Sequence, residues 1–227
     1  MDRFPGSTST PFRGELEYYC RDGTTIWTEV MALPVLDGEG CLAKLIGVSR
    51  DISERKQYER QLQEMATTDT LTSMANRRHI EQLVKQASAR ADRYGEPVTM
   101  ILCDVDHFKT INDQHGHQAG DQVLVEFSQR IRQHLRSCDS VARWGGEEFL
   151  ILLPQTTLAA ATTLAEHLRQ RMADRPFADV GNLTASFGVA EHLRHETEVE
   201  WFRRVDECLY DAKRGGRNQV RYRPMPS

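Results

Sequence analysis

The sequence predicts an α/β (α+β) fold in which helices flank a mixed central sheet, and three observations support this prediction. From about residue 66 onward, helix and strand patterns alternate along the chain. The pair Gly145-Gly146 separates two strand patterns, which is typical of a hairpin. Before residue 52, strand patterns are separated by turn residues, which indicates a small antiparallel piece ahead of the main domain.

The small piece covers residues 1–52 and consists of strands. These are expected over Glu15–Cys20, Thr25–Val35 and Leu42–Val48. The turns between them contain Asp-Gly pairs, which favour hairpins. Fifty residues with few large apolar groups would be marginal as an independent domain.

Residues 53–67 predict a linker helix, since they contain strong helix formers and neither Gly nor Pro. Ser53 is the expected N-cap. A narrow apolar stripe follows at roughly heptad spacing, formed by Ile52, Tyr58, Leu62 and Met65. The stripe fits a solvated linker helix or a dimerising signalling helix, and two heptads do not decide between them.

The main domain, residues 68–227, alternates the two kinds of element. Helices are expected over Asn76–Ala91, Asp121–Leu135, Leu158–Met172 and Val199–Lys213. Strands are expected over Val98–Cys103, Ser140–Trp144, Glu148–Leu153, Leu183–Val189 and Gln219–Tyr222. Together they predict a mixed sheet with at least one hairpin.

Composition excludes several classes of protein. The net charge of −4 argues against nucleic-acid or membrane-surface binding, and no apolar run approaches the roughly 20 residues of a membrane span. The five cysteines are scattered and form no C-x-x-C pair, which fits a reducing compartment. We therefore expect a cytoplasmic protein.

Two acidic segments carry the chemistry. An apolar strand runs into Asp104-Val105-Asp106, and alternation along a strand lets both carboxylates face one side. Oxygen ligands at a strand end suit Mg²⁺, although an acidic strand end facing solvent is the simpler interpretation. Glu147 and Glu148 follow Gly145-Gly146 directly, and an ordinary acidic hairpin is again the simpler alternative. If the hairpin and the strand end meet, Glu147 and Asp104 can share one ion.

Six motifs in order resemble the GGDEF family over about 160 residues. In chain order they are Asp69-Thr70-Leu71-Thr72 with Asn76-Arg77-Arg78, Asp104-Val105-Asp106-His107-Phe108-Lys109, Asn112-Asp113 with Gly116-His117-Gln118-Ala119-Gly120-Asp121, Arg143-Trp144-Gly145-Gly146-Glu147-Glu148-Phe149, Ala185-Ser186-Phe187-Gly188-Val189-Ala190, and Lys213-Arg214-Gly215-Gly216-Arg217-Asn218. The resemblance implies a palm-like domain and a diguanylate cyclase, which condenses two GTP into cyclic di-GMP and releases two pyrophosphates.

The resemblance also implies the roles of individual residues. Asp104, the Val105 backbone carbonyl and Glu147 match ligands of Mg²⁺ or Mn²⁺. Glu147 also matches the general base, and Glu148 assists at the metal or orients the site. The matches to guanine-binding residues are Asn112 and Asp121, with His117 either in the same pocket or stabilising its loop. The matches to phosphate-binding groups are Phe108, Lys109, Lys213 and Arg217.

Two further properties follow from the same resemblance. Cyclisation joins two GTP molecules head to tail, so the implied active unit is a two-fold homodimer. Arg136-Ser137-Cys138-Asp139 fits an R-x-x-D inhibitory site that binds the product, cyclic di-GMP. As a bare pattern, R-x-x-D also fits a surface salt bridge.

The N-terminal piece, residues 1–52, resembles the C-terminal strands of a PAS domain. Gly14 to Trp27 carries this resemblance, together with the exit Asp51-Ile52-Ser53-Glu54-Arg55-Lys56. The front half of such a domain has no counterpart in the sequence, so we do not expect a bound sensory cofactor.

Two other functions remain open at this stage. A catalytically weak or inactive GGDEF module would bind GTP or cyclic di-GMP as a regulatory domain. Another nucleotidyl-transferring palm protein would share the metal carboxylates, although the matched guanine-binding residues argue against it. Chromatography of the products separates all three.

Overall fold

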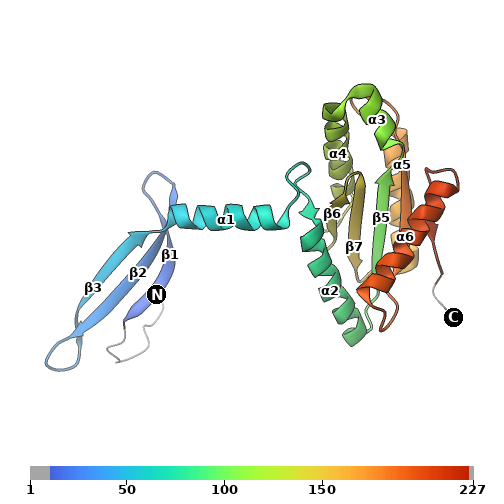
Figure 1. Ribbon diagram of the computed structural model, residues 1–227. Helices are drawn as coiled ribbons and strands as arrows, with labels where there is room; N and C mark the ends of the chain where they lie inside the picture. The colour runs from blue at the N-terminus through green and yellow to red at the C-terminus, as the bar shows by residue number, and fades with distance from the viewer. Residues whose placement is uncertain (1–10, 225–227) are drawn as a thin grey trace. The chain divides into compact units, whose positions relative to one another are not determined.

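The computed structural model describes residues 11–224, and only the backbone of residues 60–65 among them. The chain divides into two compact units, Met1–Glu64 and Met65–Ser227. Helix α1 (Ser53–Thr67) crosses their boundary and has the bounds that its composition predicts (Figure 1). Among the described residues, no helix combines the length and apolar character needed to span a membrane.

The first unit is a three-stranded antiparallel sheet in the order β1-β2-β3. Its strands are β1 (Phe12–Tyr19), β2 (Thr25–Leu36) and β3 (Leu42–Asp51). The turns lie where the sequence predicts them, and each contains a glycine with positive φ, Gly23 at 82° and Gly40 at 81°. This confirms the expected strands, while the relationship to PAS domains stays a prediction.

The start of α1 differs from the expectation for Ser53. Ser53 does not cap the helix, because its hydroxyl accepts a hydrogen bond from the Trp27 N–H at 2.9 Å and so ties the helix to β2. Ile52 is buried, and its N–H donates to the Trp27 carbonyl. It is therefore unavailable to a partner helix, whereas Tyr58 is exposed. Leu62 and Met65 lie among the side chains that are not described, so the dimerising role of this helix stays a prediction.

The second unit contains a six-stranded mixed sheet in the order β4-β6-β7-β5-β8-β9. Its strands are β4 (Ala75–Asn76), β5 (Val98–Val105), β6 (Ser140–Gly145), β7 (Glu148–Pro154), β8 (Ala185–Glu191) and β9 (Val220–Tyr222). The central strands pair antiparallel, and β4 and β9 join parallel at the two edges. The mixed sheet expected from the sequence is therefore present.

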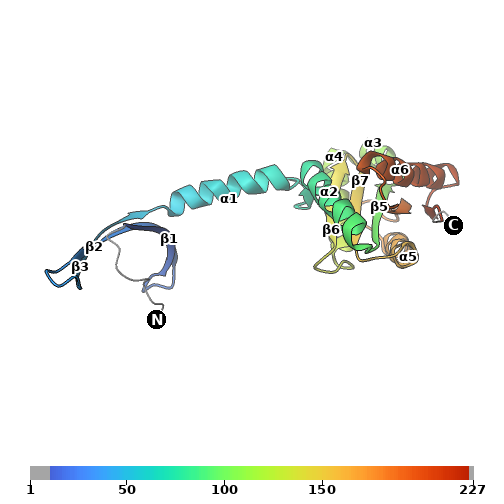
Figure 2. The ribbon, with the colours of Figure 1, turned by 90° about the horizontal axis from the view of Figure 1, so that it is seen from below.

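Helices cover both faces of this sheet. They are α2 (Arg77–Tyr94), α4 (His117–Arg132), α5 (Leu158–Asp174) and α6 (Glu198–Arg214). One apolar core lies under α4 and α5, and the other lies under α2 and α6. Figure 2 shows α5 and α6 on opposite sides of the strands. Every residue of β5 is buried because both of its faces are covered.

One helix has no counterpart among the bounds expected from the sequence. α3 (Phe108–His115) follows β5 closely, and α4 then begins at His117, four residues before the expected start. Gly116 separates the two helices with φ 83° and ψ 161°, a conformation that favours glycine. The short helix and its turn therefore carry residues that the sequence pattern treats as a loop.

Candidate active site

The predicted metal residues meet at the carboxyl end of β5. There the β6–β7 turn and the start of α3 lie at the same edge of the sheet (Figure 1). The Val105 N–H donates to the Glu147 carbonyl at 3.3 Å, and Asp104 lies opposite Glu148 in the antiparallel register. The structure thus joins the two acidic segments that are more than forty residues apart in sequence.

Asp104 is nearly buried and forms an ion pair with Lys213, whose Nζ lies 2.7 Å from Oδ2. Burial raises the pKa of Asp104 to about 6, the Lys213 ammonium opposes this rise, and the carboxylates of Glu147 and Glu148 add to it. The pKa of Glu148 is also raised, first by burial and then by nearby carboxylates that include Glu147. Three carboxylates therefore converge on one small region.

Oxygen-rich sites of this kind suit a hard divalent cation. Asp104 and Glu147 offer carboxylate oxygens. The backbone carbonyl of Val105, the residue directly after Asp104, offers a third oxygen. Among the described residues, no group of three or more His, Cys, Asp or Glu side chains is arranged to hold a metal ion. A site with two side chains and one backbone oxygen fits Mg²⁺, which keeps several positions for water and substrate phosphates.

The second carboxylate of the Asp104-Val105-Asp106 segment does not share this region. β5 ends at Val105, but its pairing with the chain before β8 continues for one more residue, since the Asp106 N–H donates to the Thr184 carbonyl at 2.9 Å. Asp106 is buried and accepts hydrogen bonds from the Thr184 and Ser186 hydroxyls, both at 2.7 Å, and from the Asn218 N–H at 3.0 Å. Both carboxylates nevertheless face one side of the sheet, as alternation predicts, because Ser186 pairs with Asp104 in the register and its hydroxyl donates to Asp106; the two acids differ in the partners that hold them.

The β6–β7 turn leaves space beside the acidic residues. Gly146 has φ 52°, which favours glycine, and a Cβ placed on either Gly145 or Gly146 would meet no atom within 4 Å. The register shifts between Arg143 and Gly145, so Trp144 forms a bulge. This turn can therefore approach a bulky ligand closely.

A positioning contact at this turn has no counterpart in the predictions from sequence. Arg143 Nε donates to the Gly146 carbonyl at 2.9 Å, and its Nη1 lies 3.4 Å from Asp69 Oδ2. Asp69 also accepts from the N–H and the hydroxyl of Thr72. Both Asp69 and Arg143 belong to motifs noted in the sequence, yet nothing in either motif shows that they contact one another.

The predicted guanine-binding residues gather where α3 meets α4. A Cβ on Gly120 would overlap Asn112 Oδ1 and come within 3.2 Å of Phe108 Cζ. The side chain of Asn112 therefore packs onto Gly120, directly beside Asp121. His117 precedes Asp121 by one helical turn and so shares its side of α4. Asp121 also borders an open cavity of about 490 Å³ together with Leu71.

The predicted phosphate-binding groups border the same region. His107 precedes α3 in the left-handed region, with φ 58°, and makes no side-chain capping bond. The N–H groups of Phe108 and Lys109 open this helix, where backbone donors and the helix dipole favour anions. Lys213 already contacts Asp104. Arg217 is exposed, and its side chain forms no ion pair within residues 11–224.

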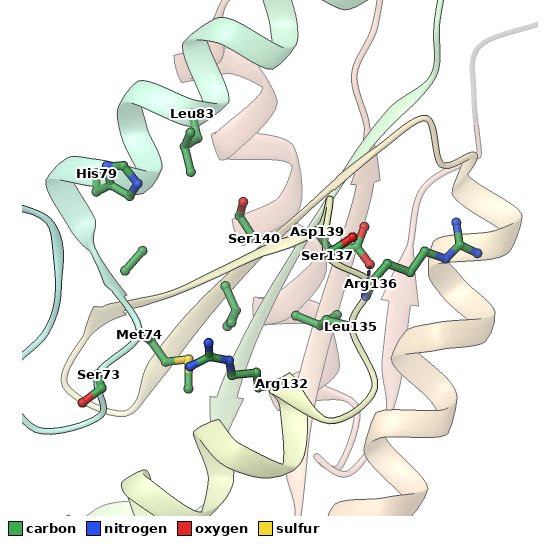
Figure 3. A pocket seen from close by; sticks show the side chains of 12 residues that line it. Ser73, Met74, His79, Leu83, Arg132, Leu135, Arg136, Ser137, Asp139 and Ser140 are labelled. Atoms are coloured by element: carbon green, nitrogen blue, oxygen red, sulfur yellow. Dashed lines mark hydrogen bonds between the residues drawn. The ribbon is translucent and has the colours of Figure 1, made fainter. Parts of the chain in front are cut away.

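The predicted inhibitory segment lies on a separate surface. The Asp139 carboxylate accepts from the Arg136 backbone N–H at 2.8 Å, and the two side chains form no ion pair in the described part of the chain. The simpler interpretation as a surface salt bridge is therefore wrong. Figure 3 shows the Arg136 guanidinium extending away from Asp139, while Arg132 reaches toward Met74. The adjoining pocket has a volume of about 370 Å³ and reaches His79 on α2.

The fold and this arrangement of residues define a nucleotide-handling domain of a known class. Residues 66–219 match the family described as "Diguanylate cyclase, GGDEF domain", and the chain belongs to this family. Diguanylate cyclase DgcM of Escherichia coli (strain K12) is 37% identical over 200 residues, which make up 88% of this chain and 48% of that protein. The chain thus spans about half the length of this relative.

Solved structures agree with the family assignment. The coiled coil and GGDEF domain of DgcB from Caulobacter crescentus, in complex with c-di-GMP, matches with a TM-score of 0.73 and 32% identity, over 76% of this chain and 93% of that chain. The active GGEEF domain of a diguanylate cyclase from Vibrio cholerae matches with a TM-score of 0.63 and 37% identity, over 66% and 98%. The family resemblance and the palm-like α/β fold expected from the sequence are confirmed.

Proposed function

We propose that this chain is a diguanylate cyclase, which condenses two GTP into cyclic di-GMP and releases two pyrophosphates. The observation that carries the proposal is the 3.3 Å hydrogen bond from the Val105 N–H to the Glu147 carbonyl. It joins the strand end that bears Asp104 to the Gly-Gly turn, next to the α3–α4 pair that bears Asn112 and Asp121. The relatives named above as diguanylate cyclases support the same conclusion.

GTP binding is assigned to three groups of residues. The Asp121 carboxylate accepts from guanine N1–H and N2–H₂, which adenine does not offer, and Asn112 and His117 complete this pocket. The N–H groups of Phe108 and Lys109 bind phosphate oxygens at the start of α3. Lys213 and Arg217 supply positive charge to the triphosphate. The selectivity for GTP over ATP therefore rests mainly on Asp121.

The reaction is attack of one GTP 3′-hydroxyl on the α-phosphorus of the other GTP. The new bond is 3′-O–Pα, the bond to the pyrophosphate oxygen breaks, and the hydroxyl proton passes to the Glu147 carboxylate. Glu148, held beside Asp104 by strand pairing, orients this site. Mg²⁺ or Mn²⁺, held by Asp104, Glu147 and the Val105 carbonyl, neutralises charge on the phosphate oxygens when it is bound. The same exchange on the second phosphate closes the ring.

Catalysis requires two copies of the chain. Each copy binds one GTP, and a two-fold axis places the two molecules head to tail. We propose residues 68–227 as the catalytic domain and the helix over residues 53–67 as the dimerising linker. A preparation held monomeric by dilution is expected to lose activity more steeply than in proportion to protein concentration. Specific activity that does not change on dilution into the monomer range would contradict this requirement.

Product inhibition is assigned to Arg136 and Asp139. The Arg136 guanidinium has no ion-pair partner in the described structure, so it is available to pair with a guanine edge or a phosphate of cyclic di-GMP. The Arg136→Ala variant is expected to raise the inhibition constant for cyclic di-GMP by about tenfold or more, since a charged hydrogen bond contributes roughly 1.5–3 kcal/mol. Arg171→Ala, which removes an exposed arginine on α5, is the control, and an equal effect of both would contradict the assignment.

The direct test is incubation of the purified protein with GTP and Mg²⁺, followed by chromatography of the products. Cyclic di-GMP is expected from the unaltered chain, and Glu147→Gln is expected to lower its formation by roughly 10²–10⁴-fold as a general base is lost. ATP in place of GTP is expected to give no cyclic product. GTP binding without product, even after fusion to a dimerising segment, would indicate an inactive receptor module instead.

A further inference from the structure

The buried carboxylate of Asp106 is a charged group that the proposed reaction does not use. Its side chain is enclosed between β5, β8 and the loop that joins α6 to β9. Three donors contact it at 2.7–3.0 Å, namely the Thr184 hydroxyl, the Ser186 hydroxyl and the Asn218 N–H. Burying a carboxylate is costly unless it is fully hydrogen-bonded, so this arrangement indicates a specific structural task.

That task concerns the α6–β9 loop, whose backbone is unusual. Arg217 and Asn218 are consecutive non-glycine residues with positive φ, 63° and 43°. Each such residue costs on the order of 1 kcal/mol and persists only where surrounding contacts hold it. The bond from the Asn218 N–H to Asp106 is one such contact, and the bond from Arg169 Nη1 to Asn218 Oδ1, at 2.7 Å, is another.

The loop that these contacts hold also carries the proposed phosphate-binding cations. Lys213 lies near the end of α6 with its Nζ at Asp104, and Arg217 follows four residues later. The Arg217 N–H donates to the Ala212 carbonyl at 3.1 Å, which connects the loop back to the helix. Asp106 therefore fixes the loop from the sheet side, while Asp104, two residues earlier, meets Lys213 directly.

We infer that Asp106 is a positioning residue, which holds the Arg217–Asn218 loop so that Arg217 and Lys213 face the triphosphate; this rests on the proposed GTP-binding function. Asp106 touches neither the substrate nor the metal. A carboxylate is required because it accepts at both oxygens, whereas an amide places an N–H₂ against one set of donors. Asp106→Asn therefore loosens the loop with almost no change in side-chain size.

The test compares the affinities of GTP and GMP, both in Mg²⁺ under conditions without turnover. GMP lacks the β- and γ-phosphates, so its binding depends mainly on Asn112 and Asp121. Asp106→Asn is expected to raise the dissociation constant of GTP by about tenfold and that of GMP by about twofold or less, since small misplacements of positioning groups cost up to roughly 10²-fold. The GMP-to-GTP ratio of dissociation constants is the deciding quantity, because general destabilisation of the domain does not change it.

A second pair of variants keeps the test decisive if Asp106→Asn does not fold. Arg169→Gln removes the other contact to Asn218 and is expected to change the ratio in the same direction. Arg171→Gln, on the same helix, makes the matched substitution at an exposed arginine whose hydrogen bond, within residues 11–224, goes to His167. It is expected to leave the ratio unchanged.

Three results would overturn the inference. Losses of GTP and GMP affinity by the same factor in Asp106→Asn would show that Asp106 has a purely structural role. A GMP-to-GTP ratio of dissociation constants that is unchanged in both Asp106→Asn and Arg169→Gln would show that the loop does not position the phosphate-binding cations. A loss of Mn²⁺ affinity in Asp106→Asn, with Arg169→Gln unaffected, would make Asp106 a metal-binding residue instead. If the unaltered protein itself does not bind GTP, the proposed function fails first, and the inference fails with it.

Discussion

Replacing Gly120 by Ala is the most specific perturbation of the proposed guanine site, because it leaves every polar group in place. Gly120 lies inside α4, and an added methyl group would overlap Asn112 Oδ1 and crowd Phe108 Cζ at 3.2 Å. The substitution therefore pushes the Asn112 side chain away from Asp121. We expect Gly120→Ala to weaken GTP binding without changing any residue assigned to contact GTP.

The expected change in stability is a difference of two opposed effects. Alanine in place of glycine inside a helix stabilises by about 1 kcal/mol. Overpacking a close contact costs about 1–3 kcal/mol. The free energy of unfolding is thus expected to fall by between about 0 and 2 kcal/mol. Loss of one neutral hydrogen bond to guanine, worth about 0.5–1.5 kcal/mol, weakens GTP binding by roughly 2- to 13-fold.

A double-mutant cycle with Asn112→Ala tests the cause. Asn112→Ala removes the atom that the new methyl group would meet, so Gly120→Ala in that background is expected to stabilise the protein. The measurements are urea denaturation for stability and isothermal titration with a non-hydrolysable GTP analogue for affinity. Gln122→Ala, on an exposed position of α4, is the control and is expected to change neither.

Two results would refute this reasoning. An equal stability cost of Gly120→Ala with and without the Asn112 side chain would show that the contact is not the cause. Unchanged GTP affinity in a stable Gly120→Ala variant would show that the position of Asn112 does not matter to guanine binding.

Two further predictions concern the frame around the site. Gly188→Ala in β8 is expected to destabilise the protein by about 3 kcal/mol or more, because the new Cβ meets the backbone of Val205 and Leu209 rather than a movable side chain. Urea denaturation measures this change. A loss of unfolding free energy smaller than that of Gly120→Ala would contradict the prediction. Burial raises the pKa of Asp69, but hydrogen bonds from Thr72 and the Arg143 guanidinium outweigh it and hold this pKa below its ordinary value. A depressed pKa in the folded state contributes stability above the unfolded pKa of about 3.9 and loses it as pH falls further. The difference in unfolding free energy between the unaltered protein and Asp69→Asn is therefore expected to be larger at pH 6 than at pH 3, and an equal difference at both would contradict it.

The order of helices and strands in the second unit was predictable from local pattern. Apolar runs such as Val98–Cys103 and the Gly145-Gly146 hairpin have short-range causes, so the observed β5, β6 and β7 lie within a few residues of their expected bounds. α3 was harder to recognise, because eight residues carry too few apolar positions to show a helical period. Ser53 shows a similar limit, since the partner of its hydroxyl, Trp27, lies 26 residues away.

The residues of the candidate site were predictable from the sequence, but the contacts between them were not. Asp104, Glu147, Asn112, Asp121 and Lys213 were all predicted by residue type, order and family resemblance. Their neighbours were not. Nothing local indicates that Arg143 contacts both Asp69 and the Gly146 carbonyl, or that Lys213 pairs with Asp104.

By itself, the sequence determined the family, the succession of elements and the residue types that the proposed chemistry on GTP needs. These depend on residue identity and on spacing over a few positions. Only the tertiary structure distinguished the two neighbouring carboxylates, because Asp104 and Asp106 differ in the partners that distant segments of the chain bring to them. Both residues face the same side of the sheet, but Asp104 meets Lys213 and lies opposite Glu148, whereas Asp106 is held by the Thr184 and Ser186 hydroxyls and by the backbone of the α6–β9 loop.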